Sequence, residues 1–586
     1  MKKLLVYLKE YKKECIIAPV FKLLEASFEL IVPLVIAAII NSGIRNENTS
    51  YIYKMCAALL GLAFIGFICS VTAQYFAAKA AVGFSTKLRH ELFSKIQSLS
   101  FSEMDKIGNS TLITRMTSDI NQVQSGVNMV LRLFLRSPFI VFGAMIMAFT
   151  VDVKAALVFV VTIPLLSIVV FGVMLVSIPL FKKVQAGLDK VLGRTRENLE
   201  GTRVIRAFNK QEEEIGYFND ENTALTNMQL IVGRISALMN PLTFIIINCA
   251  TIAVVWVGGK QVSFGVISQG EVIALVNYMS QILVELVKLA NLIILITKSI
   301  ACGNRICEVM ELEPSITEAE NVKETFVNSS SVNLTKYDDN ALTFEHVCMK
   351  YAGSKEDALT DINFSSKKGQ IIGIIGGTGS GKSTLVNLIP RFYDVSSGRV
   401  LVDGCDVRDY PLVDLRDKVA IVMQKAVLFK GTIAENLKWG KADATEEEMW
   451  NALEVAQATD VVKGKKDGLN HLIEQGGRNL SGGQRQRLTI ARAIIKDPDV
   501  LILDDSASAL DFATDAKLRT AIKKLSGDKT VVIVSQRTSS IQFANKIIVL
   551  DDGVAVGIGT HDELLEGCEV YKEIFDSQFK KEEGGK

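Results

Sequence analysis

The chain has 586 residues and a net charge of +1, with 65 Lys and Arg against 64 Asp and Glu. This length exceeds what one hydrophobic core supports, so we expect two or more domains, and the balanced charge gives no reason to expect a nucleic-acid partner. Nine scattered cysteines without a CxxC pair and only four histidines disfavour disulfides and a metal centre built from these residues.

Long apolar runs are concentrated in the first 300 residues. A membrane-spanning helix needs roughly 20 mostly apolar residues. The start of the chain is basic and amphipathic, and the apolar run after it is long enough to stay in a bilayer, so we expect no cleavable signal peptide. Six stretches are long and apolar enough to span a membrane: 16–41, 54–80, 128–150, 155–181, 240–260 and 271–301.

The connections between these stretches differ in length and charge. Three are short, at 41–50, 151–154 and 258–270, whereas 81–127 and 182–237 are long and basic. The positive-inside rule therefore predicts a multi-pass protein of the cytoplasmic membrane, with the N-terminus, both long connections and the C-terminal half in the cytoplasm.

Helical periodicity in the long connections predicts that the membrane helices continue into the cytoplasm. Their turning points are expected at Phe101–Gly108 and Ala207–Ile215, either as solvated loop tips or as surfaces facing the C-terminal domain.

Several ionisable residues fall inside the predicted spans. Such groups are costly in lipid and usually face a cavity or a partner. Glu285 and Lys288 are three residues apart on one helix, which predicts a local ion pair, with substrate contact as the alternative. Asn248 and Asn291 are expected to form hydrogen bonds between helices. The charged residues in question are Glu25, Glu29, Arg132, Arg136, Glu285 and Lys288.

Composition changes after residue 310. Residues 311–340 contain Pro314, a Ser-rich run and no periodicity, so we expect a linker between a membrane domain at 1–310 and a second domain at 341–578, followed by a polar tail at 579–586. The second domain alternates apolar strands with helices, which predicts a mostly parallel, covered sheet. Ligand chemistry then belongs at the carboxyl ends of its strands.

A phosphate-binding loop follows the apolar run 370–375. It fits Gly-x-x-x-x-Gly-Lys-Ser and precedes a helix-like segment. Glycines let backbone N–H groups close on phosphates, Lys382 supplies a positive charge, and Ser383 is placed to hold Mg²⁺. The loop comprises Gly376, Gly377, Thr378, Gly379, Ser380, Gly381, Lys382, Ser383 and Thr384.

A second block, Leu-Ser-Gly-Gly-Gln, lies about a hundred residues further on, and an aliphatic strand ending in Asp504 follows it. A carboxylate at this place near a P-loop usually serves Mg²⁺, although alone it could cap a turn. The residues of the block are Leu480, Ser481, Gly482, Gly483 and Gln484.

With these motifs in this order, the chain resembles an ATP-binding cassette (ABC) half-transporter of the exporter type over about 14–578. The resemblance implies ATP and Mg²⁺ as cofactors, with Ser383, Gln424 and Asp504 on the metal. It implies that Tyr351, otherwise an ordinary strand aromatic, stacks on adenine, and that Gln424, otherwise a surface amide, senses the membrane domain. Leu480–Gln484 is then the signature motif. The predicted fold is a membrane α-helical bundle of six transmembrane helices plus a cytoplasmic α/β P-loop NTPase domain.

Two positions depart from the family pattern. Asp505 follows Asp504 where the family has the Glu that acts as general base, and Gln536 stands where it has a His on the γ-phosphate. Aspartate withdraws the carboxylate by about 1.5 Å, although a general base has to lie within about 3 Å of its water. Glutamine donates a hydrogen bond but carries no positive charge. Either Asp505 hydrolyses ATP slowly, or the site is degenerate; two changes at catalytic positions favour the degenerate site.

Two cassettes of this family meet head to tail, and each ATP lies between one Walker A loop and the opposite signature motif. The resemblance therefore implies a heterodimer in which a non-identical half-transporter supplies the missing Glu and His. We expect export of a hydrophobic or amphipathic drug, lipid or peptide. The alternatives are a homodimeric exporter with slow hydrolysis, an importer of the same architecture, and an ATP-binding sensor without transport. A soluble cassette ATPase acting on ribosomes or DNA is disfavoured by the six apolar spans.

Overall fold

The computed structural model describes residues 2–318, 339–525, 527 and 529–579. Most of the predicted linker at 311–340 and of the tail at 579–586 lies outside these residues. The chain divides into two compact units, one formed by residues 1–97 and 109–312 and the other by 98–108 and 313–586. Residues 98–108 thus belong to the second unit although they interrupt the first in chain order. None of the nine cysteines, which all lie within the described residues, forms a disulfide.

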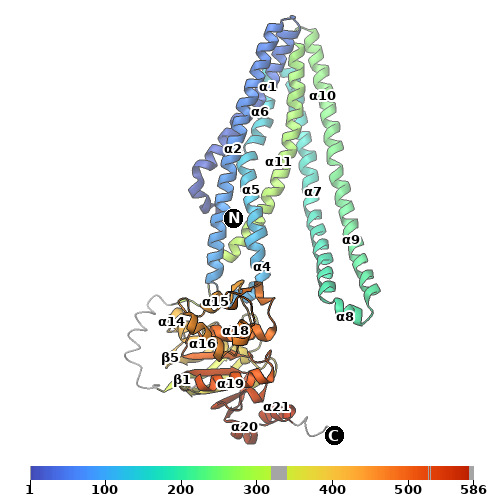
Figure 1. Ribbon diagram of the computed structural model, residues 1–586. Coiled ribbons are helices and arrows are strands. Elements are labelled where there is room, and N and C mark those ends of the chain that lie inside the picture. The colour runs from blue at the N-terminus through green and yellow to red at the C-terminus, as the bar shows by residue number, and fades with distance from the viewer. Residues whose placement is uncertain (1, 319–338, 526, 528, 580–586) are drawn as a thin grey trace. The chain divides into compact units, whose positions relative to one another are not determined.

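The first unit is entirely helical (Figure 1). Within the described residues, six helical segments are long and apolar enough to cross a membrane: Lys3–Ile44, Thr49–Ser98, Asn109–Val151, Val153–Glu200, Gln211–Ser263 and Gln269–Met310. Each extends beyond the apolar stretch seen in the sequence, because the basic connections continue the same helices. Its α-helices are α1 (Lys12–Ala38), α2 (Thr49–Ser98), α4 (Asn109–Thr114), α5 (Ile120–Leu133), α6 (Arg136–Val151), α7 (Val153–Glu200), α8 (Thr202–Ala207), α9 (Gln211–Ala237), α10 (Met239–Ser263) and α11 (Gln269–Met310).

Polar contacts fix the outer ends of these helices. Asp152 caps α7 by accepting a hydrogen bond from the Ala155 N–H at 2.8 Å. Asn41 lies in the π-helical turn Ile39–Ile44 after α1, where its Oδ1 accepts from the Gly270 N–H at 3.0 Å. A Cβ at Gly270 would lie 2.4 Å from the Ala37 carbonyl oxygen, so this position requires glycine.

One polar residue departs from its expected role. The Asn248 side chain donates to the Phe244 carbonyl oxygen of its own helix at 2.8 Å rather than to another helix. Tyr278 instead joins two helices, because its hydroxyl donates to the Leu30 carbonyl oxygen at 2.7 Å. Asn248 is exposed, whereas Tyr278 is buried among the helices of this unit, which accounts for the difference.

The second unit is built around a six-stranded sheet in the order β12-β11-β3-β10-β9-β6. Its central pairs are parallel, and only the β11–β12 pair at one edge is antiparallel. The strands are β3 (Ile371–Gly376), β6 (Val419–Val422), β9 (Val500–Asp504), β10 (Thr530–Val534), β11 (Lys546–Asp551) and β12 (Val554–Gly559).

Both faces of this sheet are covered. Ile372 and Ile374 of β3 pack into one hydrophobic cluster, whereas Ile371 and Ile375 pack into another. Successive residues of a strand point to opposite faces, so the continuous apolar run of β3 fills two cores. The helices of this unit outside residues 98–108 are α13 (Lys382–Leu388), α14 (Leu412–Lys418), α15 (Ile433–Lys438), α16 (Glu446–Val455), α17 (Thr459–Lys463), α18 (Gly482–Ile494), α19 (Phe512–Leu525), α20 (His561–Gly567) and α21 (Glu569–Phe579).

A second, antiparallel sheet was not predicted from the sequence. Its order is β2-β1-β4-β5, formed by β1 (Asn340–Met349), β2 (Leu359–Lys367), β4 (Ser397–Val402) and β5 (Cys405–Asp406). The strand β2 was missed because its sequence, LTDINFSSK, is too polar to resemble a core strand. The short strands β7 (Gly431–Thr432) and β8 (Leu472–Ile473) pair with each other.

The predicted turning point at Phe101–Gly108 is a short helix, α3 (Phe101–Ile107), within the second unit. Its Phe101 ring lies 4.7 Å from that of Phe392, and the Tyr393 hydroxyl donates to Asp105 at 2.5 Å. Ser100 caps the helix and also accepts a hydrogen bond from the Ile316 N–H. Apolar and charge-assisted contacts therefore hold α3 against this unit.

Candidate nucleotide-binding site

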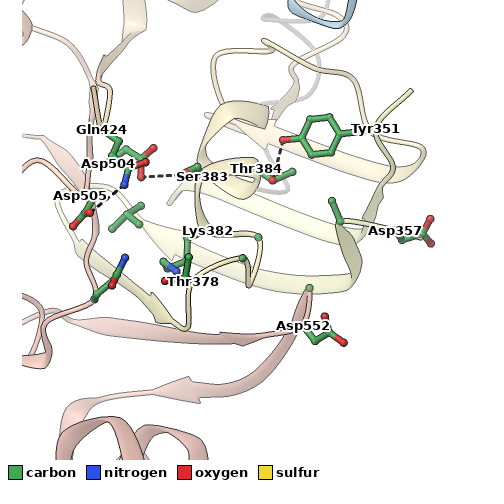
Figure 2. Close-up of a pocket in the computed structure, with 16 residues that line it drawn as sticks. Tyr351, Asp357, Thr378, Lys382, Ser383, Thr384, Gln424, Asp504, Asp505 and Asp552 are labelled. Atoms are coloured by element: carbon green, nitrogen blue, oxygen red, sulfur yellow. Dashed lines mark hydrogen bonds between the residues drawn. The ribbon is translucent and has the colours of Figure 1, made fainter. Parts of the chain in front are cut away.

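A cavity of about 310 Å³ lies at the carboxyl end of the parallel sheet. Figure 2 shows Tyr351 and Thr384 on one side of it, Asp504, Asp505 and Gln424 on the other, and Lys382 between them. The lining combines a phosphate-binding loop, two adjacent carboxylates and an aromatic ring. The residues that line it are Tyr351, Asp357, Ala358, Thr378, Gly379, Gly381, Lys382, Ser383, Thr384, Gln424, Asp504, Asp505, Val534, Gln536, Asp552 and Gly553.

The loop between β3 and α13 has a shape that only glycine permits at two places. A Cβ at Gly376 would lie 2.1 Å from the Leu550 carbonyl oxygen and 2.6 Å from the Ser380 hydroxyl. Gly381 has φ +93°, and a Cβ there would meet the Ala358 carbonyl oxygen at 2.8 Å. Close backbone packing thus explains why the Gly-x-x-x-x-Gly spacing is needed.

The Lys382 side chain folds back, so that its ammonium group contacts the preceding loop. It donates to the Gly376 and Gly377 carbonyl oxygens at 3.0 and 2.5 Å, and its contact with the Ser380 hydroxyl is 3.3 Å. Its residue is only 9 % exposed. Burial lowers the pKa of Lys382, while the charges of Asp505 and Asp504 act in the opposite direction. A desolvated cation whose partners are mostly neutral carbonyls attracts an anion strongly.

Asp504 ends β9 and meets the first residues of α13. Ser383 donates to its Oδ1 at 3.1 Å, and the residue is 5 % exposed. Burial raises the pKa of Asp504, and the neighbouring charge of Asp505 raises it further, whereas the Ser383 hydrogen bond and Lys382 oppose the rise. A divalent cation bound beside Asp504 would favour the ionised carboxylate and would therefore oppose the rise in its pKa.

Asp505 has a left-handed backbone, with φ +46°, that turns its side chain toward Gln424. The Gln424 amide donates to its Oδ2 at 3.3 Å. Burial raises the pKa of Asp505, and the Gln424 hydrogen bond, Lys382 and Arg537 oppose the rise. The carboxylate is therefore half-buried and oriented by a residue of a different loop.

Gln536 lines the cavity with an exposed side chain, two residues after the end of β10. Its backbone is held by α21, because the Gln578 amide donates to the Gln536 carbonyl oxygen at 2.8 Å. The Oε1 of Gln578 in turn accepts from the Thr538 N–H and hydroxyl, each at 2.9 Å. One side chain of the last helix thus fixes the loop that carries Gln536.

Tyr351 lies at the other end of the cavity. Its hydroxyl and that of Thr384 are 3.0 Å apart, and its ring meets Tyr393 edge to face with centroids 5.3 Å apart. Tyr393 is the residue that binds Asp105 of α3. Contacts inside the second unit therefore join the aromatic end of the cavity to the first turning point.

Comparisons with known proteins agree with this geometry. Residues 15–286 match the family model of the ABC transporter transmembrane region, and residues 359–508 match that of the ABC transporter. An uncharacterized ABC transporter ATP-binding protein of Mycobacterium tuberculosis is 36% identical over 98% of this chain and 97% of its own length. The chain belongs to the ABC transporter family, as an exporter-type half-transporter.

Other relatives agree in architecture along the whole length. The ABC transporter ATP-binding protein YfiB of Bacillus subtilis, also uncharacterized, is 35% identical over 99% of both chains. An ATP-dependent lipid A-core flippase of Vibrio vulnificus is 28% identical over 99% of this chain and 97% of its own. The solved structure of a bacterial Atm1-family ABC exporter with ATP bound has the same fold, with a TM-score of 0.78, 20% identity, and coverage of 97% of this chain and 98% of that chain.

Family membership indicates the function of each unit. The half-transporter is a multi-pass membrane protein with a cytoplasmic nucleotide-binding domain, and ATP hydrolysis is coupled to transport. The predicted fold class, with six membrane helices and an α/β P-loop domain, is confirmed.

The signature motif lies apart from the cavity of its own domain. Ser481 caps α18, accepting from the Gln484 N–H at 3.3 Å, while the Gln484 side chain accepts from the Ser481 N–H at 3.0 Å. Gly483 is tight against the next loop, because a Cβ there would lie 3.0 Å from the Ala509 carbonyl oxygen. Among the described residues that line the cavity, none comes from Leu480–Gln484.

Some lining residues of this half-transporter escaped the sequence argument. Asp357 and Asp552 lie at the Tyr351 end of the cavity (Figure 2). They flank β2 and β12, whose position beside the loop follows from sheet pairing and not from a motif. Arg537 acts on Asp505 electrostatically. The position of Arg537 directly after Gln536 was the signal in the sequence that could have indicated its role near the cavity.

Proposed function

We propose that the chain is one subunit of a heterodimeric ABC exporter whose own Walker face binds ATP but hydrolyses it slowly. Its intact signature motif, Leu480–Gln484, completes a faster site on the Walker face of a non-identical partner. The complex moves a hydrophobic or amphipathic molecule out across the cytoplasmic membrane.

The observation that carries this proposal is the contrast inside one cavity. The residues expected to bind ATP are all present, from the loop Gly376–Thr384 to Tyr351, whereas the two positions expected to be catalytic hold Asp505 and Gln536. A carboxylate shorter by one methylene and a neutral amide both weaken transition-state chemistry more than binding. Nucleotide held in such a site biases the cassettes toward association between transport cycles.

Mg²⁺ fits the oxygen atoms that surround the phosphate loop. The Ser383 hydroxyl, Asp504 and Gln424 supply the neutral and anionic oxygens that this ion prefers, and nucleotide phosphates and water would complete its shell. In the part of the chain that the structure describes, no group of three or more His, Cys, Asp and Glu side chains forms a protein-only metal cage. The bound ion would neutralise phosphate charge.

The proposed direction and substrate class draw on the relatives. A lipid A-core flippase shares the architecture over nearly the full length of this chain. The membrane unit here also carries polar and charged groups within an apolar bundle, which suits an amphipathic substrate better than a purely apolar one.

The test is ATP hydrolysis by the purified full chain in lipid nanodiscs, without a partner. We expect measurable ATP binding and slow turnover, and we expect the double variant Asp505→Glu with Gln536→His to hydrolyse ATP at least ~10-fold faster, because it regains a general base of normal reach. The matched control makes the same two changes at exposed positions outside the cavity, Asp551→Glu with Gln542→His, and is expected to leave the rate unchanged.

Brisk turnover by the unmodified chain alone, abolished by Asp505→Asn, would contradict the slow site and favour a homodimeric exporter. Absence of turnover in every variant, even together with a partner that carries Glu and His, would favour an ATP-binding sensor without transport. Inward movement of a labelled substrate in vesicles would favour an importer.

A further inference from the structure

An alternating chain of charges joins three helices of the membrane unit. Arg136 of α6 donates to Glu285 of α11 and to Glu29 of α1, both at 2.6 Å. Lys288 donates to the same Glu285 at 2.8 Å, which confirms the local ion pair expected from the sequence. The order along the network is Glu29, Arg136, Glu285, Lys288, so its net charge is zero.

The middle of this network is buried and its charges are paired, although the buried Nε of Arg136 has no hydrogen-bond partner among the described residues. Glu285 is 2 % exposed and has a third donor in the Ser137 hydroxyl at 2.8 Å, and Arg136 is 7 % exposed. A buried ion pair with several hydrogen bonds holds helices in register, which is sufficient to explain Arg136 and Glu285.

The two ends of the network differ from its middle. The side chains of Glu29 and Lys288 are 41 % and 43 % exposed, and within the described residues each has one charged partner. Both line a single cavity of about 330 Å³. A network that only joined helices would have no need to present a carboxylate and an ammonium to the same space.

The rest of the cavity is amphipathic. Asn277, Ser280 and Gln281 line it from α11, and the buried Oε1 of Gln281 has no hydrogen-bond partner among the described residues. Val32, Pro33 and Ile36 line it from one face of α1. Buried amide oxygens are rarely left without a donor, so a ligand that carries N–H groups would satisfy this one.

The depth of the cavity in the membrane also bears on which ligands can reach it. Glu29, Arg136 and Glu285 each lie about 15 residues from the outer end of their membrane-spanning segments, which is roughly 22 Å at 1.5 Å per residue. In a hydrocarbon core of about 30 Å this level is the cytoplasmic third. Headgroups of the inner leaflet lie next to this level.

We propose that this cavity binds the zwitterionic headgroup of an amphipathic substrate, with a ligand ammonium at Glu29 and Gln281, a ligand phosphate or carboxylate at Lys288, and the apolar part against Val32, Pro33 and Ile36. This inference rests on the proposed export function, whose substrate class it specifies. A ligand with both charges completes both ends of the network and leaves the net charge at zero, whereas a singly charged ligand leaves one end uncompensated.

The test is native mass spectrometry of the full chain, without nucleotide, in maltoside with an equimolar mixture of phosphatidylethanolamine and phosphatidylglycerol. We expect phosphatidylethanolamine to be retained about fivefold more than phosphatidylglycerol, the size of effect of one partly exposed ion pair. Glu29→Gln should abolish this preference, because it removes the partner of the ammonium. Lys288→Gln should lower the retention of both lipids, because both carry the phosphate that Lys288 binds. The controls Glu47→Gln and Lys54→Gln, which lie outside the cavity, should keep both the preference and the retention.

A parallel titration with glycerophosphoethanolamine, which has no acyl chains, tests whether the headgroup alone is sufficient for binding. If it displaces phosphatidylethanolamine, the cavity binds the same chemical group from a soluble source. Equal retention of both lipids overturns the proposal, as does a preference that survives Glu29→Gln or a lipid retention that Lys288→Gln leaves unchanged. Loss of a dimeric mass in the cavity variants, with lipid preference unchanged, would assign Glu29 and Lys288 to subunit contact instead. This experiment measures no ATP hydrolysis, so a negative result would not contradict the proposed slow ATP site.

Discussion

The nucleotide cavity and the membrane charge network assemble polar groups in opposite ways. Much of the nucleotide cavity comes from one continuous loop, Gly376–Thr384, whose shape is fixed by local glycines. The membrane network joins Glu29, Arg136 and Glu285, which are more than a hundred residues apart in sequence. A local loop keeps its chemistry whenever its strand and helix form, whereas the network exists only while three helices are packed together.

Removal of Glu285 should have the largest effect on stability. Glu285→Leu leaves Arg136 buried with only its Glu29 partner, and we expect a loss of about 3 kcal/mol, as for other broken buried pairs. The thermal midpoint of the chain in detergent measures it. If the network acts as one unit, the double variant Arg136→Met with Glu285→Leu should lose less than Glu285→Leu alone. Strictly additive losses would show that the contacts are independent.

Lys382→Ala tests the local site. We expect ATP affinity to fall about 100-fold, since a charge-assisted contact with phosphate contributes about 2–3 kcal/mol. Without nucleotide, the variant should have the same thermal midpoint as the native chain, because the lysine packs on loop carbonyls and not in an interface between helices. Lys368→Ala, at an exposed ion pair outside the cavity, serves as the control. A large drop in the midpoint would show that this site also depends on long-range packing.

Tyr393→Phe tests the link between the cavity and α3. It removes the hydrogen bond to Asp105 but keeps the ring against Phe101 and Tyr351. We expect amide exchange in residues 98–108 to accelerate about fivefold, the effect of about 1 kcal/mol. Asp105→Asn keeps a neutral acceptor and should give a smaller change. Unaltered exchange in Tyr393→Phe would mean that the aromatic contacts alone hold the helix.

The smallest expected effect is a pH dependence at Asp504. Burial raises its pKa, so the folded carboxyl binds its proton more tightly than the unfolded one. Stability is therefore lost as pH rises from the ordinary value of 3.8 through the raised pKa, and the cost is complete above it. Without Mg²⁺ and ATP, Asp504→Asn should raise the free energy of unfolding at pH 7 by on the order of 1 kcal/mol, and with it the thermal midpoint.

The gain from Asp504→Asn should shrink as pH falls through the raised pKa of Asp504 toward 3.8, because the folded carboxyl then takes up its proton. Adding Mg²⁺ and ATP should stabilise the native chain more than the variant, because the ion compensates the charge that burial penalises. Parallel pH profiles for the two proteins would contradict this account.

Much of the fold was predictable because its signals are local. Apolar runs of about 20 residues predicted the membrane helices, and β3 and β9 were recognisable as continuous aliphatic runs bounded by turns. The strand β2 was not, because its polar residues make sense only beside β1, with which it pairs in antiparallel register. The loop held by Gln578 likewise depends on a contact with the last helix.

The sequence by itself determined the family, the six spans and the residues of the phosphate loop, since each rests on the composition or backbone geometry of a short segment. Only the tertiary structure decided that Arg136 lies between Glu29 and Glu285, and that Gln424 orients Asp505. The reason is physical: a charge in sequence has no partner until packing brings one within about 3 Å, and the free energy of desolvation then decides which pairs form.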